Sequence, residues 1–142
     1  MSACESSLVA LDSGQKNYGL AANSSVIYSQ WKLVDFKGNT NFKYDVSVEF
    51  KADKNEKGFQ VLNGKSSINF YLANFKINEL KKEISISELI VTQIAGKEEE
   101  RKFEDDYLKA LQEVEKYEIK ENLLTLYLSG NTGKNIKFKL SI

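Results

Sequence analysis

The sequence predicts a mainly β protein of the α+β class, in which a curved antiparallel or barrel-like sheet of about eight strands packs on one amphipathic helix. Two observations predict this fold. Apolar and polar residues alternate along short segments from Val26 onward, which is the period of strands with one buried face. Only the segment between Lys97 and Lys116 has apolar residues at helical spacing. Because strands precede and follow this helix in uninterrupted runs, no strand–helix–strand repeat indicates parallel pairing.

The clearest predicted strand is 45–51, where Val46, Val48 and Phe50 share one face and charged or polar residues occupy the other. The C-terminal segment 135–142 repeats this pattern with lysines on its outer face, which discourages edge-to-edge pairing. The remaining strands are predicted at 27–36, 58–62, 67–77, 83–92, 117–120 and 123–128.

Turn signals separate these strands. Asn63-Gly64, between two apolar runs, is the strongest hairpin signal in the chain, and Glu121-Asn122 predicts a second tight hairpin. Apolar positions change phase near Ser87-Glu88, which predicts a β-bulge there. Further turns are predicted at 37–39, 55–58 and 129–133.

The predicted helix carries Phe103, Tyr107, Leu111 and Val114 at three- and four-residue spacing. Acidic residues crowd its first half and Lys116 ends it, which suits the helix dipole. The acidic cluster 98–106 lacks the Asp and Gly spacing of a calcium loop. We therefore interpret it as solvated helix surface and expect no metal site.

Composition excludes several classes of function. The 142 residues contain no His and one Cys, and 20 Lys and Arg balance 20 Asp and Glu for a net charge of +0. Without His, the chain has no Ser-His-Asp or Cys-His nucleophile and no His-bearing zinc site. Zero net charge argues against nucleic acid as a partner. We expect a protein that is not an enzyme and needs no cofactor.

Two patterns point weakly to other chemistry. The carboxylate pairs Asp35/Asp45 and Glu104/Asp105 are of the type that glycosidases use, but nearness in sequence does not place carboxylates across a cleft. A carboxylate-only hydrolase is therefore disfavoured. Segment 131–134 ends in the Gly-Lys of a phosphate loop but lacks that loop's first Gly and its helix, so we interpret it as a hairpin turn.

Residues 1–25 differ from the rest because they are rich in Ser, Gly, Asn and Ala without a sustained period, which predicts a flexible tether. Ser2-Ala3-Cys4 resembles the end of a bacterial lipobox, in which the Cys is lipidated. We predict a lipid on Cys4 that anchors the protein in the cell envelope, on a periplasmic or outer-membrane face, with no other membrane contact. The alternative is a cytoplasmic protein that starts at Met1 and exposes Cys4 incidentally.

Several motifs follow one another in a recognisable order: Trp31-Lys32-Leu33, the strand 48–50, segment 63–71, segment 92–96, and the helix and strands of 104–128. In this order they resemble the META domain family, which includes HslJ-like proteins, over residues 26–142. The resemblance implies a bacterial envelope protein, often a lipoprotein, that is loosely linked to stress, motility and drug tolerance. It implies no enzymatic reaction and no cofactor.

The chain departs from the family pattern at one pair of positions. Many members carry Cys where this sequence has Ile68 and Gly96, and both cysteines are absent together. If those cysteines pair in relatives, this chain has replaced the link with packing, and any redox role is lost.

The resemblance also marks Trp31, Gly64, Asn69 and Thr92 as motif positions, which we interpret as structural. We expect Asn69 and Thr92 to hydrogen-bond the backbone near a turn, because short polar side chains in such places usually do so.

Aromatic residues of the first half occupy both odd and even positions of their predicted strands, so their side chains point to both faces of the sheet. Either both faces are buried or one face forms a patch for a partner. We interpret most of them as core. Tyr44 and Tyr71, each with a polar tip, are the residues that we select for an interaction surface.

Three hypotheses follow. The leading one is a monomeric, non-catalytic envelope module that binds another protein, a peptide or a glycan, and it predicts an exposed patch. The alternative is a periplasmic inhibitor or chaperone-like module that pairs a partner with a sheet edge, and it predicts an unpaired edge strand. The third, the hydrolase, predicts a deep pocket that holds carboxylates with raised pKa values.

Overall fold

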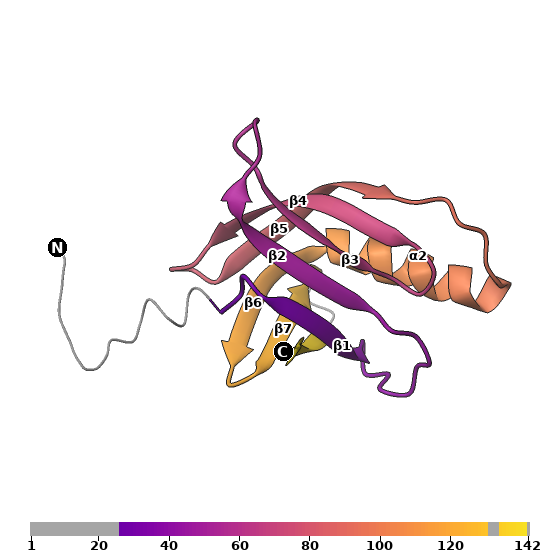
Figure 1. The fold of residues 1–142 in the computed structure, drawn as a ribbon. Coiled ribbons are helices and arrows are strands. Elements are labelled where there is room, and N and C mark those ends of the chain that lie inside the picture. The colour runs from indigo at the N-terminus through magenta and orange to yellow at the C-terminus, as the bar shows by residue number, and fades with distance from the viewer. Residues whose placement is uncertain (1–25, 131–133, 142) are drawn as a thin grey trace, which may run out of the picture.

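A computed structural model describes residues 26–130 and 134–141. Eight strands form a closed antiparallel barrel in which each strand pairs with its neighbours in the sequence and the last pairs with the first (Figure 1). The expected fold class, a mainly β barrel-like sheet with one amphipathic helix, is confirmed. The elements are β1 (Gln30–Phe36), β2 (Ser47–Lys54), β3 (Gln60–Lys65), β4 (Phe70–Asn78), β5 (Glu83–Val91), α2 (Glu98–Gln112), β6 (Val114–Lys120), β7 (Leu123–Leu128) and β8 (Asn135–Ser141).

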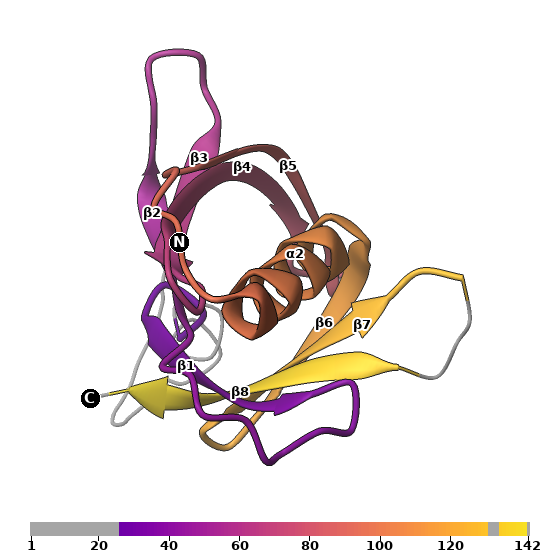
Figure 2. The same ribbon diagram turned by 90° about the vertical axis from the view of Figure 1, so that its right-hand side faces the viewer.

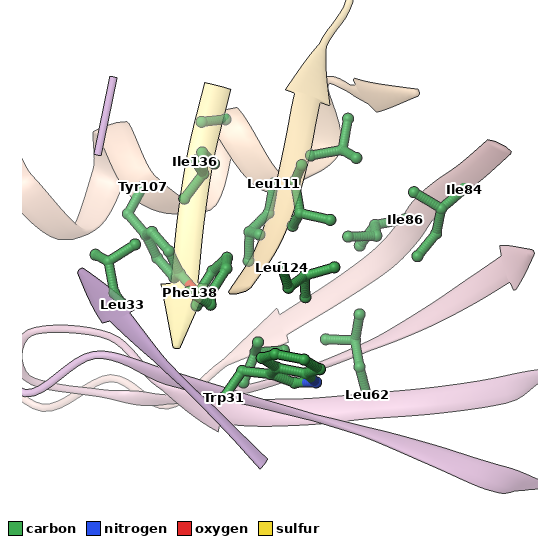
Figure 3. Packing of buried hydrophobic residues seen from close by; sticks show 14 of the residues in the cluster. Trp31, Leu33, Leu62, Ile84, Ile86, Tyr107, Leu111, Leu124, Ile136 and Phe138 are labelled. Atoms are coloured by element: carbon green, nitrogen blue, oxygen red, sulfur yellow. The ribbon is translucent and has the colours of Figure 1, made fainter. Parts of the chain in front are cut away.

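Helix α2 lies inside the curve of the barrel, between β5 and β6 (Figure 2). It buries Tyr107, Leu108, Ala110 and Leu111 and leaves most of its charged residues exposed. Figure 3 shows Tyr107 and Leu111 reaching from the helix into the core that also contains Trp31. Among residues 26–130 and 134–141, no helix is long and apolar enough to cross a membrane.

The alternation of the strands produces this core directly. Trp31 and Leu33 of β1, Val48 and Phe50 of β2, and Ile136 and Phe138 of β8 are all buried, whereas the residues between them are more exposed. Trp31 is fully buried, and its ring Nε1–H donates to the Ile27 carbonyl at 3.1 Å. The indole is therefore a structural element of the core.

The predicted bulge is present in β5. Leu72 of β4 pairs with Ile90, and Asn74 pairs with Ser87. A two-residue advance along β4 therefore lies opposite a three-residue advance along β5, which has one extra residue. Glu88 takes the extra position with a φ of 54°, which is the left-handed conformation that such bulges use. The bulge bends β5 around α2.

One predicted turn is wrong. Asn63-Gly64 lies inside β3, and the chain reverses instead at 66–69, so the predicted strand 67–77 begins at Phe70. The Ser66 N–H donates to the Asn69 carbonyl at 2.9 Å and closes this later turn. The tight turn at Glu121-Asn122 is confirmed, and Glu121 adopts a φ of 58° there.

The helix is shorter than predicted. It ends at Gln112, because the Glu113 N–H bonds the Ala110 carbonyl and Val114 then pairs with Leu128 in the sheet. At the other end, the Glu100 carboxylate accepts the Lys97 N–H at 2.9 Å, which satisfies one of the helix's unpaired N-terminal donors.

Candidate functional site

A buried carboxylate joins α2 to the β3–β4 turn. The Glu104 side chain accepts hydrogen bonds from the Ser66 hydroxyl and from the Asn69 backbone N–H at 2.9 Å. The Asn69 side-chain amide donates to its second oxygen at 2.8 Å. The interpretation of the acidic cluster as solvated surface is therefore wrong for Glu104, which is only 6% exposed. Neighbouring Asp105 is exposed as expected.

The hydrogen bonds decide the charge of this carboxyl. Burial alone raises the pKa of Glu104, but hydrogen bonds from Ser66, Asn69 and Ile68 outweigh it and hold the pKa below its ordinary value. Glu104 is therefore ionised at neutral pH and serves as a negatively charged acceptor for the turn.

Asn69 and Thr92 extend the network to the end of β5. The Asn69 Oδ1 accepts the Thr92 hydroxyl and the Ile94 N–H, each at 2.7 Å, and the Thr92 hydroxyl oxygen accepts the Phe70 N–H at 3.1 Å. The prediction that these two side chains satisfy backbone groups near a turn is confirmed. Their arrangement is structural.

Gly64 is explained by a tyrosine pair inside the barrel. The Tyr71 hydroxyl donates to the Ser47 carbonyl at 2.7 Å and lies 2.7 Å from the Tyr107 hydroxyl. A Cβ at Gly64 would lie 2.0 Å from that carbonyl oxygen. Only glycine fits this position of β3. Burial raises the pKa values of Tyr71 and Tyr107, so both remain protonated hydrogen-bonding groups.

Ile68 and Gly96, the two positions at which the chain departs from the family pattern, are in contact. A Cβ at Gly96 would lie 2.2 Å from the Ile68 Cδ1. The isoleucine side chain therefore occupies the space that a residue larger than glycine would need. Packing between a large and a small residue joins these two segments.

The outer face of β4 and β5 carries an apolar patch, which we define as Phe70, Leu72, Ile90 and Ile94. Their side chains are 57%, 46%, 66% and 55% exposed. Leu72 and Ile90 are cross-strand partners, and Phe70 lies two residues before Leu72 on the same face. Ile94 lies beside the start of β4, because its N–H donates to the side chain of Asn69, the residue before Phe70.

A hollow of about 220 Å³ borders the patch. Phe70 is among its lining residues, and its polar lining residues include Gln30, Ser47, Glu49, Asn63 and Lys65. Lys65 is the cross-strand partner of Phe70, and Asn63 is that of Leu72. The apolar patch therefore has a polar margin of mixed charge, as protein interfaces do.

The predicted surface residues do not form this patch. The selection of Tyr71 is wrong, because its side chain is 3% exposed and faces the barrel interior. Tyr44 is half-buried, with its ring 4.9 Å from that of Phe103. Apolar residues at both odd and even positions of 70–75 indicate that one face of this strand could be exposed. The exposed face is the one that carries Phe70 and Leu72. Cys4 lies outside the described residues.

The proposed hydrolase pairs do not converge. Asp45 is exposed and pairs with Lys32 at 3.5 Å, whereas Asp35 accepts the Gly38 N–H at 2.8 Å in its own turn. Glu104 is buried and Asp105 is exposed, so they face different surroundings. Within residues 26–130 and 134–141, no group of three or more Cys, Asp or Glu side chains could hold a metal ion.

Comparison with known proteins decides the family. The family model described as the META domain matches residues 24–141. The chain belongs to the META domain family. No curated protein matches the chain.

Solved structures share the fold of this META domain. An NMR structure of a protein from Burkholderia xenovorans superposes with a TM-score of 0.64 at 17% identity, over 90% of this chain and 92% of the other. A crystal structure of a DUF4847 family protein from Bacteroides vulgatus gives a TM-score of 0.59 at 16% identity, over 83% and 96%. A further NMR structure gives a TM-score of 0.58 at 18% identity, over 82% and 92%.

Proposed function

We propose that this META-domain protein is a non-catalytic binding module of the bacterial cell envelope. In this proposal, a lipid on Cys4 holds the domain at the membrane, and the apolar patch contacts another envelope protein or a peptide. The contiguous exposure of Phe70, Leu72, Ile90 and Ile94 is the observation that carries it. The largest exposed apolar patch of a soluble protein is often functional, and apolar patches with polar margins are typical of interaction sites.

The composition of the patch favours protein over glycan. Three of its four residues are aliphatic, and Phe70 is its single aromatic. Sugar recognition relies on polar groups that orient hydroxyls around an aromatic face, whereas aliphatic side chains bury best against other aliphatic side chains. We therefore place protein or peptide partners ahead of a glycan.

Two measurements test the proposal. Mass spectrometry of the protein expressed with its native upstream region should find lipid on Cys4, and Cys4→Ser should release the protein from the membrane fraction. A photo-crosslinking residue at Leu72 should capture an envelope protein from intact cells. The same residue at Lys76, exposed farther along β4, is the matched control. Unlipidated protein, or equal capture from both positions, would contradict the proposal.

A second candidate is the inhibitor or chaperone-like module that pairs a partner with a sheet edge. Barrel closure removes most edges, but β5 and β6 pair only at Glu83 and Lys116. In the described part of the chain, this single pair leaves part of β5 without a strand beside it.

A further inference from the structure

The seam between β5 and β6 is the weakest point of barrel closure. Among the described residues, strand pairing across it is limited to Glu83 opposite Lys116, with one more bond from the Tyr117 N–H to the Lys82 carbonyl. Beyond this point the two strands diverge, and α2 lies between them on the inner side of the sheet (Figure 2). Within residues 26–130 and 134–141, no strand pairs with the later part of β5 on the side opposite β4.

The backbone of this later part has a defined direction. The Thr92 N–H donates to the Phe70 carbonyl at 3.0 Å, and the Ile94 N–H donates to the Asn69 side chain at 2.7 Å. Both bonds point toward β4 and its preceding turn. Because N–H and C=O groups alternate in direction along an extended chain, those of Val91 and Gln93 point to the other side.

The same segment carries half of the apolar patch. Ile90 and Ile94 are exposed, as is Thr92 between them, so these three side chains lie on the outer face next to the edge. An extended chain beside Val91–Gln93 would place alternate side chains on this face, against Ile90 and Ile94. One short segment of β5 and its continuation thus offers main-chain bonds and apolar contacts together.

The size of the apolar patch distinguishes between its possible partners. Four partly exposed side chains expose on the order of a few hundred Å², whereas each partner of a stable interface buries roughly 800 Å². The patch is therefore small for a dimer of this domain. Charge gives a second argument, because the margin carries both Lys65 and Glu49 and so differs from the cationic surface that an anionic bilayer attracts.

We propose that an extended segment of a partner protein, with apolar side chains at alternate positions, pairs with Val91–Gln93 and covers Ile90 and Ile94. This inference rests on the proposed binding function and names the class of partner. The bulge at Glu88 interrupts the edge before this segment, so the paired stretch is short and ends where the chain turns into α2. Main-chain pairing supplies affinity, and the apolar side chains supply selectivity.

A designed peptide tests the proposal directly. The probe is a terminally blocked peptide of alternating Val and Thr, compared with a version whose main-chain nitrogens are methylated at alternate positions. Binding is followed by the amide NMR signals of the unlipidated domain. We expect the unmodified peptide to shift the signals of Val91 and Gln93 and to slow their hydrogen exchange, and we expect the methylated peptide to bind at least about tenfold more weakly.

Variants at the edge sharpen the test. Gln93→Pro removes an edge donor without removing a bond to β4, whereas Gln93→Ala keeps the N–H and is the matched control. We expect about tenfold weaker peptide binding for Gln93→Pro and unchanged binding for Gln93→Ala, provided thermal unfolding shows both variants folded. Ile90→Ser/Ile94→Ser should also lose binding, with Lys76→Ser as its control.

Several outcomes would overturn the inference. These are no peptide binding at about 1 mM, equal binding of the methylated peptide, or Gln93→Pro that is folded and binds normally. A dimer that Ile90→Ser/Ile94→Ser dissociates would assign the patch to a second copy. Patch-dependent sedimentation with phosphatidylglycerol vesicles would assign it to the membrane. Lipid on Cys4 and capture of an envelope protein from Leu72 would survive the three peptide results, so the two proposals fail separately. A dimer or a membrane contact through the patch would instead remove the capture of an envelope protein from Leu72.

Discussion

The two faces of the sheet where β4 begins differ in how their side chains are satisfied. On the inner side, Tyr71 bonds Ser47 and Tyr107, and Asn69 and Glu104 bind one another and the neighbouring backbone. On the outer side, Phe70 and Leu72 stand largely uncovered. These polar groups on the inner side are hydrogen-bonded within the fold, whereas the apolar side chains on the outer side are exposed and could pack against a partner. The difference separates residues that maintain the structure from residues that a partner can contact.

The largest effect on the inner face is expected for Gly64→Ala. The new Cβ would lie 2.0 Å from the Ser47 carbonyl oxygen and 2.7 Å from the Tyr71 hydroxyl. Because the first of these is backbone, β2 and β3 must separate, and we expect a loss of about 4 kcal/mol in the free energy of unfolding. Urea unfolding followed by Trp31 fluorescence measures it. Asn63→Ala, at the preceding position on the outer face, is the control and should lose less than about 1 kcal/mol.

Glu104→Ala should cause the next largest loss of stability. It leaves the Asn69 and Ile68 N–H groups without their acceptor in a buried turn and restricts the Ser66 hydroxyl to the Asn69 carbonyl, which together costs about 3 kcal/mol. Asp105→Ala removes an exposed carboxylate one residue away and should change stability by less than about 0.5 kcal/mol. Equal losses from both variants would show that the buried network contributes nothing.

Acid should weaken the inner face selectively. The pKa of Glu104 is held below its ordinary value of 4.5 in the folded state, so its contribution to stability is fully present above pH 4.5 and is lost as the pH falls through the folded value. We expect wild-type stability to fall steeply in this range. Glu104→Gln should have a lower stability at neutral pH and a shallower acid slope. Parallel pH profiles for the two proteins would contradict the assignment.

Sequence patterns predicted the strands of the barrel, the helix and the bulge. The strands and the bulge follow from the alternation of apolar residues, and the helix follows from their three- and four-residue spacing. They did not predict the position of the β3–β4 turn. Asn63-Gly64 has ideal hairpin chemistry, but Gly64 is needed inside β3 for the Tyr71 hydroxyl, and Glu104 holds the turn at 66–69 from a segment far along the chain. Such long-range partners leave no local signal.

The same limit applies to the site. Mixed parity in the aromatic segment 70–75 indicated that one face could be exposed, but the pattern has no information about which face turns inward. Tyr71 enters the barrel because Tyr107 and Ser47 provide partners for its hydroxyl, and this directs Phe70 and Leu72 outward. The buried role of Glu104 was hidden because it stands among exposed acidic residues.

A smaller effect is expected where Ile68 meets Gly96. In Gly96→Ala the new Cβ would contact the Ile68 Cδ1, which is the flexible end of its side chain, so we expect a loss of about 1 kcal/mol. Ile68→Val removes that methyl group. The double variant Ile68→Val/Gly96→Ala should therefore be more stable than the sum of the two single losses predicts. Strict additivity in urea unfolding would mean that the two residues do not pack as the structure shows.

The smallest effect on stability should come from the outer face. Leu72→Ser and Ile90→Ser replace side chains that are already 46% and 66% exposed, so each should change the free energy of unfolding by less than about 0.5 kcal/mol. Ile90→Ser should also strongly reduce crosslinking from position 72 to a partner, because a partner would bury the Ile90 side chain. Lys76→Ser should change neither quantity. A stability loss of about 2 kcal/mol in Leu72→Ser would mean that the outer face also holds the barrel together, and the division between the two faces of the sheet would then be wrong.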